Sequence, residues 1–182
     1  FPLNPEPGDE NEDVRERGRL KFSTDSLDFF SDEGQTGVSA SNRIRGVVLH
    51  DILSRVRTVG ELEDAVAASV MNGELRDDEA EEAAALLSER ISRVAGYSWF
   101  PDDPDAVFNE QELIDTDGSV LRPDRVVVSG GRVTVVDYKF GEHRKSYERQ
   151  VRRYADIWNR MGYDDVSAYL WYVQSGEVKK IV

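Results

Sequence analysis

Residues 121–139 read LRPDRVVVSGGRVTVVDYK, two valine-rich runs joined by a pair of glycines. Valine favours strands and glycine takes positive φ at little cost, so the stretch predicts a β-hairpin with the glycines as its loop. Opposed residue numbers in a hairpin sum to a constant. Ser129 therefore faces Arg132, and Asp124 lies directly across from Asp137.

Charged groups crowd one spot of this hairpin. Cross-strand neighbours share a face of the sheet, and Lys139, two residues beyond Asp137, points the same way. Like charges set opposite each other destabilise a sheet, so a cation between Asp124 and Asp137 would stabilise the pair. Carboxylate oxygens suit Mg²⁺ or Mn²⁺, and a metal held there can activate water for phosphodiester cleavage. The alternative is two surface aspartates that form ion pairs with Lys139.

The preceding segment predicts a second hairpin. Residues 107–114 favour a strand, and the Thr-Asp-Gly sequence at 116–118 fits a three-residue loop with its glycine in the left-handed conformation. The resulting register pairs Asp115 with Ser119.

Continued along the same strands, this register sets Glu110 opposite Asp124. Glu110, Asp124 and Asp137 then form a row of carboxylates across three strands. A four-residue loop would break the row, and a loop moved by one residue would select Glu112 instead; we prefer Glu110.

These residues carry a family resemblance. Pro123-Asp124 followed by Asp137-Tyr138-Lys139 resembles the signature of the PD-(D/E)XK nuclease superfamily. Five motifs also occur in the order seen in RecB/AddA-type nuclease domains, and the resemblance covers residues 43–182. The motifs are Gly46-Val47-Val48-Leu49-His50, Glu110, Arg122-Pro123-Asp124-Arg125, Asp137-Tyr138-Lys139-Phe140-Gly141 and Gln150-Val151-Arg152-Arg153-Tyr154.

The resemblance implies a fold and an activity. The fold would be α/β, a restriction-endonuclease-like αβββαβ core with a mixed sheet of about five strands and additional N-terminal helices. The activity would be that of a Mg²⁺- or Mn²⁺-dependent deoxyribonuclease, exodeoxyribonuclease V-like. It would belong to the C-terminal nuclease domain of an ATP-dependent helicase–nuclease that acts in double-strand-break repair.

The same resemblance implies partners: DNA, a helicase domain in the same longer chain, and a second, AddB/RecC-like subunit. The chain has no P-loop motif, so an ATP-driven motor would lie outside it. Two other readings stay open. One is an inactive nuclease-like module that binds DNA or a protein partner, and the other is a stand-alone nuclease of repair or defence.

Residue roles also follow from the resemblance. A lone histidine in an amphipathic helix is usually structural, but His50 matches a metal ligand of the family. The implied metal ligands are His50, Asp124, Asp137 and the backbone carbonyl of Tyr138, and the implied catalytic residues are Asp124, Asp137, Lys139 and Glu110. Lys139 would position or activate water and stabilise the transition state, while Glu110 would bind a second metal or orient the water.

Residues 138–160 form the basic part of the chain, with seven Lys and Arg residues against three acidic ones. Gln150 and Tyr154 lie one helical turn apart and match the family's Gln-x-x-x-Tyr motif. The residues expected to contact nucleic acid are Gln150, Tyr154, Arg122, Arg149 and Arg153. The alternative is an ordinary solvated helix face.

Composition sets further bounds. The net charge of −13 means that attraction to DNA must be local, or supplied by other parts of a longer chain. No apolar run approaches the roughly 20 residues that span a bilayer, so no membrane association is expected. With no cysteine, the iron–sulfur cluster of some relatives cannot form, and a cytoplasmic location fits.

Composition also suggests the organisation of the chain. Residues 1–42 are interpreted as a linker and short N-terminal extension, with a short helix near residues 23–30, and residues 43–182 as the nuclease domain. The chain lacks an initial methionine, and we expect a further segment before it. The expected elements of the domain, besides the two hairpins, are a helix from Arg43, helices at 61–71, 77–95 and 146–161, and strands at 166–173 and 177–182.

Overall fold

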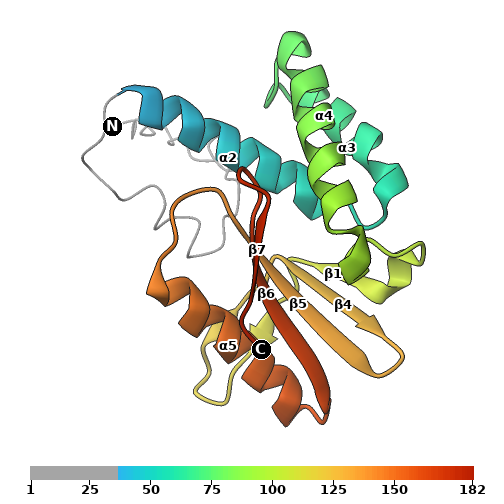
Figure 1. Ribbon diagram of the computed structural model, residues 1–182, viewed down its shortest axis with the longest axis vertical. Helices are drawn as coiled ribbons and strands as arrows, with labels where there is room; N and C mark the ends of the chain where they lie inside the picture. Colours follow the sequence, from blue (N-terminus) through green and yellow to red (C-terminus); the bar gives the residue numbers. More distant parts are fainter. Residues whose placement is uncertain (1–36) are drawn as a thin grey trace, which may run out of the picture. The chain divides into compact units, whose positions relative to one another are not determined.

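The structure, a computed structural model, describes residues 37–182 and side chains from Arg45 onward. Of the linker and extension expected at residues 1–42, residues 1–36, with the short helix expected near 23–30, lie outside the described residues. In chain order the elements are α2 (Gly37–Arg55), η1 (Val59–Glu61), α3 (Leu62–Met71), α4 (Asp77–Arg93), η2 (Ala95–Tyr97), η3 (Pro104–Ala106), β1 (Val107–Asn109), β2 (Leu113–Ile114), β3 (Val120–Leu121), β4 (Arg125–Ser129), β5 (Arg132–Lys139), α5 (Lys145–Arg160), β6 (Asp165–Tyr172) and β7 (Glu177–Lys180) (Figure 1).

The main sheet has five strands in the order β1-β4-β5-β6-β7. β5 and β6 are parallel and the other neighbours are antiparallel, so the expected mixed sheet is confirmed. Parallel neighbours need a long crossover, and α5 supplies it between β5 and β6 (Figure 1). The expected α/β class with a five-stranded sheet and additional helices before it is therefore correct.

The register of the valine-rich hairpin is also confirmed. Ser129 faces Arg132 across the loop, where Gly130 and Gly131 have φ angles of 59° and 82°. At the far end of the pair Arg125 faces Val136. The next residues outward are Asp124 and Asp137, so the sheet register brings the two aspartates to the same end of the hairpin.

The strand expected at 107–114 is wrong as a single element. It is interrupted after β1, and its second half pairs with β3 in a separate two-stranded sheet. Glu110 sits at the break with a φ of 53°. The positive φ at Glu110 turns the backbone out of the extended conformation, so the ladder cannot continue there.

The predicted pairing nevertheless survives the break. Val107 faces Val127 before the break, and Leu113 faces Leu121 after it. The residue numbers of the two pairs have the same sum, so the register is the same on both sides. The Glu110 N–H donates to the Asp124 carbonyl at 3.0 Å, which keeps the two residues opposite each other. Glu110 thus occupies the position expected from the register.

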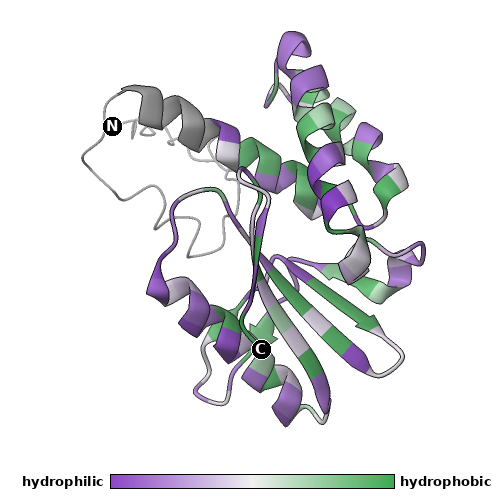
Figure 2. Cartoon of the chain, viewed as in Figure 1, coloured by the Kyte–Doolittle hydropathy of each residue, from purple (hydrophilic) through white to green (hydrophobic). Residues whose placement is uncertain are grey.

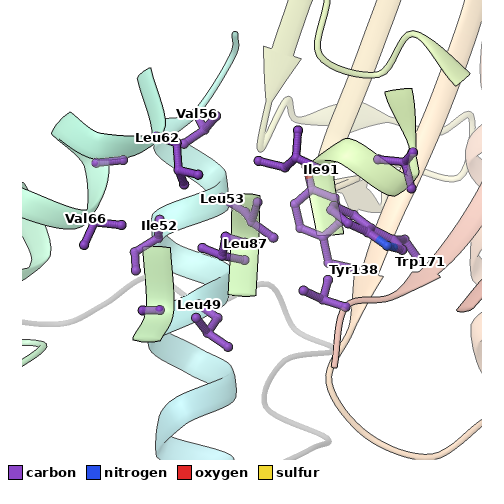
Figure 3. Packing of buried hydrophobic residues seen from close by; sticks show 14 of the residues in the cluster. Leu49, Ile52, Leu53, Val56, Leu62, Val66, Leu87, Ile91, Tyr138 and Trp171 are labelled. Atoms are coloured by element: carbon purple, nitrogen blue, oxygen red, sulfur yellow. The ribbon is translucent and has the colours of Figure 1, made fainter. Parts of the chain in front are cut away.

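Helices cover both faces of the main sheet (Figure 1). Alternate residues of β5 point to opposite sides: Val135 packs with α5, and Val136 packs with the α2–α4 group. Figure 3 shows the hydrophobic cluster between the α2–α4 group and the sheet, in which Leu53 of α2 and Leu87 of α4 lie near Tyr138 and Trp171. Hydrophilic residues run along the outward sides of α4 and α5 (Figure 2).

Some predicted boundaries differ from the structure. α2 begins at Gly37 and not at Arg43, and α4 ends at Arg93, after which η2 takes the chain through Ala95. β7 ends at Lys180. Among the described helices, none has the length and apolar character needed to cross a membrane.

Candidate metal centre and active site

Three side chains converge at the end of the sheet where β4 begins and β5 ends. His50 comes from α2, Glu110 directly follows β1, and Asp124 directly precedes β4. Each offers a potential ligand atom, and these atoms lie within 4.8 Å of one another. His50 Nε2 is 3.0 Å from Asp124 Oδ1 and 3.6 Å from Glu110 Oε1. Three separate segments therefore build one compact group.

Glu110 reaches this group because of its backbone conformation. A positive φ costs a residue with a side chain about 1–2 kcal/mol, so the surrounding structure must hold it in place. Its N–H bonds to the Asp124 carbonyl, and its Oε2 accepts from Arg122 Nε at 2.8 Å. The turn at Glu110 therefore ends the strand and directs the carboxylate toward His50.

His50 reaches the group because α2 approaches the sheet closely. A Cβ added to Gly46, one turn before His50, would lie 3.0 Å from the Phe140 Cβ. The His50 ring packs edge-on against Tyr138 and Phe140, with centroid distances of 5.9 and 6.3 Å. The glycine of the Gly-x-x-Leu-His sequence thus allows the helix to seat its histidine beside the strand ends.

Asp124 is buried and held on both of its oxygens. Oδ1 contacts His50, and Oδ2 accepts the backbone N–H of Tyr138. The amide of Tyr138, rather than its carbonyl, is the group seen to contact Asp124. The carbonyl's role as a metal ligand stays a prediction.

Asp137 and Lys139 form an adjacent ion pair. Lys139 Nζ lies 2.6 Å from Asp137 Oδ2, and the two side chains are only 11% and 3% exposed. Nζ also lies 4.3 Å from the ring centroid of Tyr147 in α5. Lys139 thus points the same way as Asp137, as the strand alternation predicts. Asp137 is not a member of the three-residue group, so its role as a ligand remains a prediction.

Charges in the group shift its pKa values strongly. Burial opposes the charged form of His50, but the charges of Asp124, Glu110 and Asp137 outweigh it and raise the pKa to about 9. Burial and the charge of Asp124 raise the pKa of Glu110 to about 7, although His50 and Arg122 act in the opposite direction. His50 therefore stays protonated at neutral pH, whereas Glu110 is only partly ionised there because its carboxylate is buried beside that of Asp124.

Asp124 and Lys139 both remain charged. Burial would raise the pKa of Asp124, but His50, Lys139 and the Tyr138 N–H hold it below its ordinary value. Burial would lower the pKa of Lys139, but Asp137 and Asp124 raise it above its ordinary value. A protonated amine therefore lies next to the acidic cluster.

A divalent cation fits these residues. Glu110 Oε1 is buried without a hydrogen-bond partner, although it points into the group. One imidazole nitrogen and two carboxylate oxygens make a donor set suited to Mg²⁺ or Mn²⁺. A cation there would coordinate Glu110 Oε1, which lacks a hydrogen bond, and would take the place of the proton on His50.

Residues expected to bind nucleic acid connect α5 to this centre. Gln150 Nε2 donates to Tyr154 Oη at 2.7 Å, and Tyr154 Oη donates to the Arg122 carbonyl at 3.4 Å. The Arg122 side chain in turn pairs with Glu110. The Gln-x-x-x-Tyr pair therefore supports the segment that orients Glu110, and Arg122 has a partner within the site.

Arg153 has partners within the protein, and its contact with nucleic acid stays a prediction. Its guanidinium donates to Asp115, Asp117 and Ser119, each at 2.6 Å, and so attaches α5 to the β2–β3 hairpin. The prediction of a DNA contact overlooked this ion pairing because the acidic partners lie far away in sequence. Arg149 is exposed on α5, as a DNA contact requires.

Sequence reasoning gave no role to Asn109 and Arg125. They face each other on β1 and β4, and Arg125 is fully buried. A charged residue at the start of a valine-rich strand was the available signal, because a buried arginine needs several acceptors.

The fold and the charged end of its sheet are typical of metal-dependent nucleases. The family model of the PD-(D/E)XK nuclease superfamily matches residues 19–181, while no curated protein matches the chain. The chain therefore belongs to the PD-(D/E)XK nuclease superfamily. The match begins ahead of the domain boundary expected near residue 43.

Proposed function

We propose that the chain is a deoxyribonuclease that hydrolyses DNA phosphodiester bonds with Mg²⁺ or Mn²⁺. One observation carries the proposal: ligand atoms of His50, Glu110 and Asp124 lie within 4.8 Å of one another. The Lys139 ammonium, paired with Asp137, lies beside them in a largely desolvated position. This combination supplies ligands for a cation and a positive charge for a phosphate.

His50, Glu110 and Asp124 would hold the cation, with Asp137 and the Tyr138 carbonyl as further predicted donors. When bound, it would polarise a phosphate oxygen and lower the pKa of water. Lys139 would orient the attacking water and stabilise negative charge on the phosphate, and its raised pKa keeps it protonated for that task.

The other residues would keep the substrate and ligands in place. Arg122 fixes one oxygen of Glu110 and leaves the other directed at the cation site. Gln150 and Tyr154 support Arg122 from α5. Arg149 and the exposed Arg152 add positive charge along the same helix, which favours binding of the phosphate backbone despite the net charge of −13.

We further propose that the chain is the nuclease part of a RecB/AddA-like helicase–nuclease in double-strand-break repair. The order of its five motifs supports this assignment. A helicase domain in the same longer chain and an AddB/RecC-like subunit would then be its partners. An exodeoxyribonuclease V-like enzyme acts from DNA ends.

Digestion of labelled DNA by the purified chain tests the proposal. Linear single- and double-stranded substrates should be cleaved with Mg²⁺ or Mn²⁺ and left intact with EDTA, while closed circular duplex should survive. Asp137→Ala should abolish cleavage with the fold intact. Cleavage by the Asp137→Ala variant, or cleavage that EDTA leaves unchanged, would contradict the catalytic assignment. Cleavage of closed circles would contradict the end-dependent one.

A further inference from the structure

We propose that Asn109 and Arg125 are positioning residues of the metal centre. Facing each other on β1 and β4, they bind carbonyls at and just beyond the end of α2 and thereby set His50 against Glu110 and Asp124. The inference rests on the proposed function only in that the three residues hold a cation. The positioning itself can be measured without metal and without DNA.

Arg125 binds the chain just beyond the end of α2. Its guanidinium donates to the carbonyls of Val56 and Arg57, the latter at 3.3 Å. Helix C-termini leave carbonyls without intrahelical partners, and their partial negative charge favours a cation. A fully buried guanidinium thus caps the end of the helix that carries His50.

Asn109 binds the same end of α2 from the neighbouring strand. Its Nδ2 donates to the Ser54 carbonyl at 2.8 Å and to the Val56 carbonyl at 3.0 Å. Asn109 and Arg125 are direct cross-strand partners and share the Val56 carbonyl as an acceptor. The two side chains therefore act as one clamp.

Each clamp residue is the chain neighbour of a ligand. Asn109 directly precedes Glu110, and Arg125 directly follows Asp124. The clamp therefore fixes the helix with His50 to the two backbone segments that carry the other ligands. His50 and Val56 are about 9 Å apart at the rise of an α-helix, so the clamp acts on His50 over a short distance.

Arg125 also attaches to the sheet interior. Its Nε donates to Tyr138 Oη at 2.7 Å, Nη1 donates to the Trp99 carbonyl at 2.6 Å, and the guanidinium lies 3.9 Å from the Phe100 ring centroid. The Tyr138 backbone N–H meanwhile bonds Asp124. Tyr138 thus binds Arg125 through its side chain and Asp124 through its backbone, so a shift of one of these residues displaces the other.

α2 is held on the other side of His50 as well. Gly46 lies so close to Phe140 that a Cβ at this position would be only 3.0 Å from the Phe140 Cβ, closer than an ordinary van der Waals contact. His50 lies between this contact and the clamp at Ser54 and Val56. Loss of the clamp would therefore let the helix pivot about Gly46 and move the imidazole away from Asp124.

The chain has two histidines, which allows a direct measurement. We would record the ring proton NMR signals of His50 and His143 in metal-free protein, with His143→Gln for assignment. His143 bonds Tyr172, which belongs to the cluster that packs with α5, and serves as an internal reference. In Asn109→Ala and Arg125→Lys, the His50 signal should shift while the His143 signal stays in place.

Mn²⁺ titration gives the second measurement. Loss of residues that orient metal ligands weakens metal affinity by about 10–100-fold, and we expect a decrease of that size for both variants. The matched control is Arg90→Lys. Arg90 also donates to two backbone carbonyls, those of Val173 and Gln174, but far from the clamp in sequence and on a different helix. It should lower Tm without changing either histidine signal or Mn²⁺ affinity.

The outcomes separate the two proposals. Asn109→Ala removes a single amide, so it retains a folded protein for comparison if Arg125→Lys unfolds. An Asn109→Ala variant with the His50 signal and Mn²⁺ affinity of the parent would overturn the clamp. A shifted His50 signal in a chain whose parent neither binds Mn²⁺ nor cleaves DNA would support the clamp and refute the proposed nuclease.

Discussion

Two acidic clusters, one around Asp115 and one around Glu110, differ in how the protein binds their carboxylates. Asp115 on the β2–β3 hairpin accepts hydrogen bonds from Arg153 and Arg160, both at 2.6 Å. Five residues earlier, Glu110 has one oxygen on Arg122 and the other buried without a hydrogen-bond partner. Both oxygens of Asp115 are thus hydrogen-bonded to a cation, whereas one oxygen of Glu110 is not.

The pKa values express the same contrast. Hydrogen bonds from Arg153, the Thr116 N–H and Arg160 lower the pKa of Asp115 to about 2. Burial and Asp124 raise the pKa of Glu110 to about 7. A carboxylate whose two oxygens are both hydrogen-bonded within the protein serves the fold, and one with a buried oxygen that lacks a hydrogen bond favours binding of an outside cation. The predictions below test that distinction.

The largest expected effect is on cleavage by Asp124→Asn. The substitution keeps the shape but removes the buried charge between His50 and the Tyr138 N–H, so the rate should fall by about 10³-fold or more. Asp115→Asn is the matched control: it should lower Tm and leave the rate per folded molecule unchanged. Single-turnover cleavage with circular dichroism checks both, and equal loss of rate in the two variants would erase the distinction.

Lys139→Met should lower the rate by about 10²–10³-fold, because it removes the positive charge available to the phosphate. Arg153→Met, which removes a cation from the hairpin cluster, should weaken the fold instead. Mn²⁺ affinity should remain measurable in Lys139→Met, since Lys139 is not a ligand. A purified Lys139→Met protein with parental single-turnover rates would rule out its role.

Metal affinity should rise with pH. Ligands bind a metal in their deprotonated forms, and the metal-free pKa values are about 9 for His50 and about 7 for Glu110. Below pH 7 both protons must leave, so affinity should rise by up to about 100-fold per pH unit. Between pH 7 and 9 only His50 loses its proton, and the slope should fall to about tenfold. Mn²⁺ calorimetry in buffers of different ionisation enthalpy measures the released protons, and a flat profile would exclude His50 as a ligand.

The difference between the clusters also shows what the sequence could predict. Strand register follows from loop length and alternation, so the alignment of Glu110 with Asp124 and the direction of Lys139 could be predicted from residue numbers. Ion pairs across helices do not follow from local rules. The attachment of Arg153 to Asp115 therefore became visible only in three dimensions.

The same limit applies to the clamp and to the break in the first strand. Asn109 and Arg125 bind carbonyls more than 50 residues away, and no periodicity encodes such a contact. The interruption at Glu110 depends on the positive φ that the site stabilises. Local propensity predicts the elements, and tertiary contacts determine where they stop.

Glu110→Asn tests the strained conformation. Asparagine tolerates positive φ better than glutamate, so the variant should be as stable as the parent or more stable, while its shorter amide reaches the cation poorly. We expect cleavage to fall by about 10–100-fold and Mn²⁺ affinity to fall with it. Thermal unfolding together with Mn²⁺ titration measures both quantities. Loss of stability without loss of metal affinity would assign Glu110 to the fold alone.

The smallest expected effect is on the pH dependence of stability without metal, where the two carboxylates should act in opposite directions. The pKa of Asp115 is depressed in the folded state, so its contribution is present above about pH 4 and is lost as the pH falls toward 2. The pKa of Glu110 is raised, so the folded state loses stability as the pH rises from the ordinary glutamate pKa of 4.5 to about 7.

Urea unfolding across this pH range should show that Asp115→Asn flattens only the acid limb and that Glu110→Gln flattens only the decline toward neutral pH. Since Mn²⁺ would offset the charge on Glu110, its addition should abolish that decline in the parent and leave the acid limb unchanged. A decline that persists with bound metal would mean that Glu110 does not cause it.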